Sequence, residues 1–196
     1  ATVVHHGIDP SQFCPADKKI ARSRLGLPNG RLIGCFGRVR HQKGTDVFVD
    51  AMLANVANHP DIVGVILGRA TKEHTSFEQN LKSKISKAGL SNRIRFYGEV
   101  TVDAIPEWYQ ALDLFIAPQR WEGFGLTPLE AMVCGVPVIA TRVGAFEELI
   151  VDGETGRLVA CDDVMAMSIA LNDALSNPET LPRWSTAARA HVALHF

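Results

Sequence analysis

The sequence predicts an α/β fold, in which a parallel sheet carries helices on both faces. Short apolar runs alternate along the chain with segments of helical periodicity, and the connections between them are short. This alternation is typical of parallel strands joined by crossover helices, which cover both faces of the sheet. After two of the expected strands, a glycine-bearing loop leads into the start of a helix. These loops are residues 37–44 and 118–127.

The expected strands are compact apolar runs, and most of them end at a glycine or a proline. They are predicted at residues 31–36, 61–67, 93–97, 113–117, 136–140 and 157–159. The last of these is expected to be a short edge strand.

The expected helices are bounded by capping and breaking residues. They are predicted at residues 20–25, 46–58, 73–88, 101–112, 128–134, 144–150, 162–175 and 178–193. Thr45 and Thr127 are the expected N-caps of the second and fifth helices, and Thr101 or Asp103 that of the fourth. Gly26, Gly89 and Gly135 are expected to end helices, and Trp184 is expected to anchor the last one by its apolar ring.

Composition excludes several classes of protein. With 196 residues, 46% of them hydrophobic and 21% charged, the chain can bury a full core. Its net charge of −1 gives no reason to expect nucleic acid as a partner. No apolar run reaches the length of a membrane span, and the first residues do not resemble a signal peptide.

The cysteines and histidines do not predict a metal site. The four cysteines are far apart in the sequence, and we expect Cys35 and Cys134 to be buried thiols. A reduced, cytoplasmic protein is the simplest interpretation. His5 and His6 are adjacent, so in a strand they would point to opposite faces rather than share a metal.

The stretch from Pro118 to Thr141 combines two chemical features. Its glycines and the expected helix N-terminus favour an anion, because the first-turn N–H groups and the helix dipole are positive. Glu122 and Glu130 bracket the loop and would accept hydrogen bonds from hydroxyl groups. Together these features suit a sugar joined to a phosphate. Thr127 and Glu130 also fit a capping box, in which Glu130 only bonds the helix start.

The loop at residues 37–44 likewise connects a strand, the first, to the N-terminus of a helix. Arg38 and Lys43 supply positive charge suited to a diphosphate. From composition alone, a solvated basic loop explains the same residues. No Gly-x-Gly-x-x-Gly fingerprint, Walker loop or nucleophile elbow is present, which argues against a dinucleotide dehydrogenase, a phosphate-loop NTPase and an α/β-hydrolase.

These motifs resemble those of the family 4 retaining, nucleotide-sugar-dependent glycosyltransferases, which have the GT-B fold. The family motif is two glutamates separated by seven residues, and Glu122-Gly-Phe-Gly-Leu-Thr-Pro-Leu-Glu130 fits it. Gly7-Ile8-Asp9, Phe13 and Pro15 resemble the family's interdomain connection. The resemblance therefore implies an interdomain connection and lead-in at residues 1–26. Residues 27–196 would form a Rossmann-like, nucleotide-sugar-binding domain, the carboxyl-terminal half of a larger protein whose amino-terminal domain is absent.

The resemblance also implies roles for individual residues. Arg38 and Lys43 would bind the donor diphosphate, Glu122 a hydroxyl of the donor sugar and Glu130 the ribose. Tyr97 and Val100 would border the base. The remaining residues expected to approach the donor are Gly37, Gly68, Arg69, Gly123, Phe124, Gly125, Leu126 and Thr127.

The whole enzyme would transfer a hexose with retention, without a metal or a cofactor. More narrowly, the chain resembles lipopolysaccharide core mannosyltransferases, which favours GDP-mannose as the donor. The acceptor, a glycan or a lipid-linked glycan, would bind mainly to the amino-terminal domain, at the cytoplasmic face of the inner membrane. Three alternatives stay open: a sugar-nucleotide 2-epimerase of the same fold, a non-catalytic nucleotide-binding module and an unrelated flavodoxin-like domain.

Overall fold

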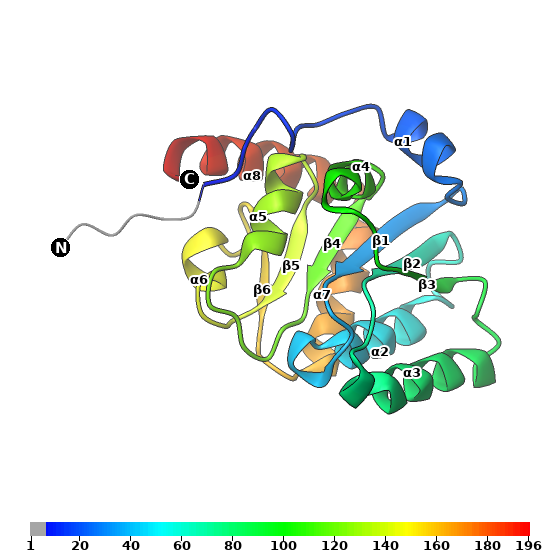
Figure 1. Ribbon diagram of the computed structural model, residues 1–196. Coiled ribbons are helices and arrows are strands. Elements are labelled where there is room, and N and C mark those ends of the chain that lie inside the picture. The colour runs from blue at the N-terminus through cyan, green and yellow to red at the C-terminus, as the bar shows by residue number, and fades with distance from the viewer. Residues whose placement is uncertain (1–6) are drawn as a thin grey trace.

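The three-dimensional structure, a computed structural model, describes residues 7–196. The His5-His6 pair, for which no shared metal was expected, lies outside the described residues. A six-stranded sheet forms the centre of the domain (Figure 1). The strands are β1 (Arg31–Phe36), β2 (Ile62–Leu67), β3 (Ile94–Gly98), β4 (Leu114–Ala117), β5 (Val138–Thr141) and β6 (Gly156–Val159).

All five neighbouring strand pairs are parallel, and the strand order is β3-β2-β1-β4-β5-β6. The chain therefore builds outward from β1 to β3, returns to the middle, and builds outward again from β4 to β6. This reversal creates a crevice beyond the carboxyl ends of β1 and β4, where open α/β sheets bind ligands. The predicted sheet is confirmed, including the short edge strand β6.

Helices cover both faces of the sheet, as predicted. The α-helices are α1 (Lys18–Leu25), α2 (Thr45–Asn55), α3 (Thr75–Lys87), α4 (Ile105–Gln110), α5 (Leu126–Val133), α6 (Phe146–Leu149), α7 (Val164–Ser176) and α8 (Thr180–His195). Three short 3₁₀ turns are η1 (His41–Lys43), η2 (Lys72–His74) and η3 (Val102–Ala104).

Alternate strand residues supply the two halves of the core. In β1, Leu32 and Phe36 pack with α4, α5 and the end of α8, whereas Ile33 and Cys35 pack with α2, α3 and α7 (Figure 1). All four side chains are buried, as strands covered on both faces require. Cys35 and Cys134 are buried, as predicted, and Trp184 anchors α8 to the core.

Three predicted N-caps are wrong. Gly44, with φ of 68°, occupies the cap position of α2, so Thr45 is already helical. Gly125, with φ of 80°, caps α5, and Thr127 lies within its first turn. Thr101 occupies the cap position of the 3₁₀ turn η3 without a side-chain cap bond, and Asp103 lies inside that turn. The helix α4 begins only at Ile105, after Ala104. In the first two cases a glycine makes the sharp left-handed entry that a threonine disfavours.

Candidate functional site

A pocket of about 510 Å³ lies in the crevice beyond the carboxyl ends of the strands, and we call it the switch-point pocket. The loops after β1, β2 and β3 and the entry into α5 all contribute to it. Its lining residues are Phe36, Gly37, Arg38, Lys43, Leu67, Gly68, Arg69, Glu99, Val100, Ile105, Tyr109, Glu122, Phe124, Leu126, Thr127 and Glu130.

Glycines allow the backbones of the loops after β1 and β2 to approach each other closely beside the pocket. The Gly37 N–H donates to the Leu67 carbonyl at 2.9 Å, which extends the pairing of β1 and β2 past the sheet. A Cβ on Gly68 would stand 2.0 Å from the Gly37 carbonyl oxygen, and Gly68 has φ of 122°. Only glycine fits there, so the two loops present bare backbone to the pocket.

The N-terminus of α5 faces the same space through Leu126 and Thr127. Its first intrahelical hydrogen bond runs from the Leu129 N–H to the Gly125 carbonyl, at 3.2 Å. The N–H groups before Leu129 are therefore not used by the helix, and they carry the positive end of its dipole. An anionic group in the pocket would meet this helix end.

Lys43 and Glu122 form an ion pair in the pocket, with 2.7 Å between Nζ and Oε2. Both side chains are largely buried, with 22% and 16% of their surfaces exposed. Burial raises the pKa of Glu122, but the hydrogen bond and the charge of Lys43 outweigh this and hold it below the ordinary range. We predicted both residues as ligand contacts, and the sequence did not indicate that they bind each other.

Glu130 is not part of a capping box. Its Oε2 accepts a hydrogen bond of 2.8 Å from the hydroxyl of Tyr109, a fully buried residue of α4. Burial raises the pKa of Glu130, and the Tyr109 hydrogen bond partly opposes that shift. Burial and the Glu130 charge raise the pKa of Tyr109 well above normal, so the phenol keeps its proton. The hydroxyl thus holds one carboxylate oxygen of Glu130 in place.

Arg38 and Arg69 are exposed at the pocket edge, and neither forms an ion pair with another described residue. Together with Lys43 they give the pocket three cations, opposed by the carboxylates Glu99, Glu122 and Glu130. Cations and hydroxyl acceptors therefore share one cavity, an arrangement suited to a polyanion that also bears hydroxyl groups.

Most of the predicted site residues line the switch-point pocket, but Tyr97, Gly123 and Gly125 do not. The Tyr97 ring packs against Trp108, 5.0 Å away, and its hydroxyl has no hydrogen-bond partner. Gly125 serves as the cap of α5, and Gly123 donates its N–H to Glu122 Oε1 at 3.1 Å.

Among the lining residues that we did not single out, Tyr109 is the most informative. Its sequence signal was weak, because a tyrosine in a predicted helix is usually a core residue. Phe36 and Leu67 are the last residues of their strands, and the strand prediction alone places them beside the loops.

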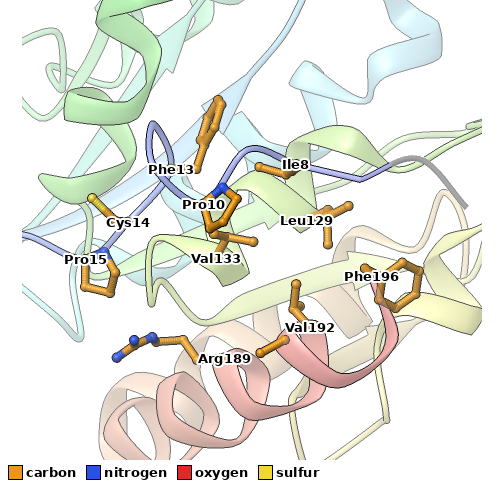
Figure 2. Close-up of a pocket in the computed structure, with 11 residues that line it drawn as sticks. Ile8, Pro10, Phe13, Cys14, Pro15, Leu129, Val133, Arg189, Val192 and Phe196 are labelled. Carbon is orange, nitrogen blue, oxygen red and sulfur yellow. The ribbon is translucent and has the colours of Figure 1, made fainter.

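A second hollow, the apolar groove, lies between the amino-terminal segment, α5 and α8 (Figure 2). It measures about 440 Å³, and its lining includes Phe13, Leu129, Val133 and Val192. Arg189 is the one charged residue of that lining. The groove lacks the convergent polar groups of the switch-point pocket, so it is the weaker candidate site.

The described part of the chain contains neither a metal-binding cluster nor a membrane-spanning helix. It holds no group of three or more His, Cys, Asp and Glu side chains placed to bind a metal ion. Within residues 7–196, no helix combines the length and the apolar character of a membrane span.

The fold and the pocket define a Rossmann-like α/β domain with a pocket lined by cations and carboxylates at the switch point of its sheet. The model of the glycosyl transferases group 1 family matches residues 17–191. The chain therefore belongs to the glycosyl transferases group 1 family.

Similar proteins agree with this assignment. The chain is 59% identical over its whole length to the lipopolysaccharide core biosynthesis mannosyltransferase LpsB of Rhizobium meliloti, of which it covers 56%. It is 46% identical to the corresponding enzyme LpcC of Rhizobium leguminosarum, again over the whole chain and 55% of the relative. The chain thus spans about half the length of the curated relatives it matches.

Solved structures confirm the GT-B type of fold. The C-terminal domain of a group 1 glycosyl transferase, LpcC of Francisella tularensis, superposes with a TM-score of 0.91 at 34% identity. That match covers 96% of this chain and 97% of the other. Anabaena HepE, solved in complex with UDP, gives a TM-score of 0.90 at 27% identity, covering all of this chain and 53% of HepE.

Proposed function

We propose that this domain binds the nucleoside-diphosphate hexose donor of a retaining hexosyltransferase, with GDP-mannose as the donor. One observation carries the proposal: the switch-point pocket joins Arg38, Lys43 and the start of α5 to the hydroxyl acceptor Glu130. The mannosyltransferase names of the two Rhizobium relatives support the choice of sugar.

The pocket residues would act mainly on the leaving group. When the bond between the sugar C1 and the β-phosphate oxygen breaks, the electron pair stays on the phosphate. Arg38, Lys43 and the free N–H groups of α5 would stabilise that growing negative charge. The acceptor oxygen forms the new bond to C1, and its proton passes to the departing phosphate. These guanidinium, ammonium and amide donors would do this without a metal ion.

Glu130 would orient the nucleotide. With one oxygen held by Tyr109, the other oxygen of its carboxylate is available to the hydroxyl groups of a ribose. Glu122 would accept a hydrogen bond from the donor sugar, and Gly68, Arg69 and Val100 would border the nucleotide.

The relatives' names support a lipopolysaccharide core as acceptor, bound mainly by an amino-terminal domain. The reaction would take place in the cytoplasm, at the face of the inner membrane.

A thermal melting panel tests the nucleotide assignment. Bound ligand raises the apparent stability of the folded state, by about 2.7 kcal/mol at a hundred times its Kd. We expect GDP to raise the Tm more than UDP, ADP or CDP. A larger shift with UDP would identify the base of the donor as uracil instead of guanine, the base present in the UDP complex of HepE. No shift with any nucleoside diphosphate would overturn the proposal.

A further inference from the structure

The ion pair of Lys43 and Glu122 has one fixed partner and one flexible partner. Glu122 Oε1 accepts the Gly123 N–H at 3.1 Å, and the Phe124 N–H also bonds this carboxylate. The carboxylate is thus held by its own loop. Lys43 reaches it on a four-carbon stem with rotatable bonds, so the ammonium can reorient while Glu122 stays in place.

This geometry places a negative charge beside the phosphate position. A phosphate oxygen bound to Lys43 Nζ would lie about 2.8 Å from it. When Lys43 keeps its ion pair, with Nζ 2.7 Å from Glu122 Oε2, that oxygen would lie within about 5.5 Å of the carboxylate. At this range a unit of extra charge on the phosphate weakens binding by about threefold in water and over a hundredfold in a low-dielectric site.

The nucleoside-diphosphate sugar and the nucleoside diphosphate left after sugar transfer differ by one unit of negative charge. In a nucleoside-diphosphate sugar the β-phosphate is a diester with one negative charge. In the free diphosphate it is a terminal phosphate, which loses a second proton near pH 6.

We propose that Glu122 makes the switch-point pocket discriminate the nucleoside-diphosphate sugar from the free nucleoside diphosphate. It accepts a hydroxyl of the sugar when the donor is bound, and it repels the terminal phosphate once the sugar has gone. Glu122 thereby favours donor binding and product release. This inference rests on the proposed function of the pocket.

The test is a pair of calorimetric titrations, with GDP and with GDP-mannose, on the wild-type chain and on Glu122→Gln at pH 8. UDP and UDP-glucose are titrated in parallel. The ligand pair that binds to the wild type is then used to compare the wild type with Glu122→Gln. We expect the ratio of the Kd of the diphosphate to the Kd of its sugar to fall at least threefold in Glu122→Gln. An unchanged ratio would overturn the inference, because it would leave Glu122 only the role of neutralising Lys43.

A second measurement repeats both titrations at pH 5.5. At pH 5.5 the terminal phosphate regains its proton while Glu122, held by Lys43, stays ionised. The ratios of the wild type and of Glu122→Gln should therefore lie closer together at pH 5.5 than at pH 8, and an equal separation at the two pH values would contradict the inference. The other ionisable groups that line the pocket, Arg38, Arg69, Glu99, Tyr109 and Glu130, face the nucleotide in both ligands. Because the wild type and Glu122→Gln share these groups, their attraction or repulsion of the phosphate cancels when the two proteins are compared.

A matched control removes a carboxylate charge elsewhere. Glu107 pairs with Arg24 at 3.5 Å on the outer side of α4, and it does not line the pocket. Glu107→Gln should leave the ratio unchanged. If the wild type binds none of the four ligands, the proposed function itself fails, which is a different outcome from an unchanged ratio.

Discussion

Replacing Tyr109 by Phe removes one hydroxyl from the switch-point pocket and tests how Glu130 is held. Tyr109 has no exposed surface, and its ring packs against Phe36 and Phe115, with centroid distances of 4.8 and 5.4 Å. Phe preserves that packing, so the variant loses little besides the 2.8 Å hydrogen bond to Glu130. A hydrogen bond to a charged group contributes roughly 1.5–3 kcal/mol, and one between neutral groups roughly 0.5–1.5 kcal/mol.

The cost of Tyr109→Phe should therefore depend on pH. The pKa of Glu130 is raised by burial, so this residue favours folding at low pH and loses that contribution as pH rises through its folded pKa. The Tyr109 hydrogen bond lowers this pKa, and the variant's Glu130 pKa is therefore higher still. We expect the free energy of unfolding to fall by roughly 1.5–3 kcal/mol at pH 7.5, and by less at pH 4, where Glu130 is protonated.

Urea denaturation at the two pH values measures this difference. Tyr97→Phe is the matched control, because the Tyr97 hydroxyl is buried without a hydrogen-bond partner. Its removal should cost nothing, or even stabilise the fold, at either pH. An equal loss of stability at pH 4 and pH 7.5 in Tyr109→Phe would show that its hydroxyl does not stabilise the Glu130 carboxylate.

Four further perturbations test the nucleotide contacts and the backbone of the pocket. Arg38→Ala and Lys43→Ala should each weaken binding of a nucleoside diphosphate by roughly 1.5–3 kcal/mol, with a smaller effect on the parent nucleoside; equal losses in calorimetry would contradict a phosphate contact. Chelator should leave nucleotide affinity unchanged, since Arg38, Lys43 and the start of α5 supply the positive charge; a large loss in the same titration would show that a metal takes part. Gly68→Ala should lower the free energy of unfolding by roughly 1–3 kcal/mol from backbone strain alone, because its Cβ would lie 2.0 Å from the Gly37 carbonyl oxygen. A urea midpoint equal to that of the wild type would refute this close approach.

The sequence predicted those parts of the site that depend on order along the chain. Alternating apolar runs and helices specify a parallel sheet, and the carboxyl ends of its strands bring the loops after β1, β2 and β4 together. The strand ends, together with the resemblance to the family 4 glycosyltransferases, pointed to Arg38, Lys43, Glu122 and Glu130. Their meeting in one cavity follows from the strand order, which the spacing of single motifs does not contain.

The parts that escaped prediction depend on contacts between distant residues. Lys43 and Glu122 are 79 positions apart, and Tyr109 and Glu130 are 21 apart. Local spacing made Glu130 equally suitable for a capping box, and only the buried hydroxyl from α4 shows that it bonds elsewhere. The cap positions of α2 and α5 were misassigned because local preference favoured threonine over the glycine before it.

The central claim, that Glu130 binds the ribose of a nucleoside diphosphate, is tested most directly by a double-mutant cycle. Calorimetry would compare GDP and 2′-deoxy-GDP on the wild type and on Glu130→Gln, which replaces a double acceptor by a group that is half donor. We predict that the mutation weakens the binding of GDP by roughly 1–3 kcal/mol. It should weaken the binding of 2′-deoxy-GDP by less, because that nucleotide already lacks the 2′-hydroxyl partner. Additive losses from mutation and deoxygenation would contradict a contact between Glu130 and the 2′-hydroxyl.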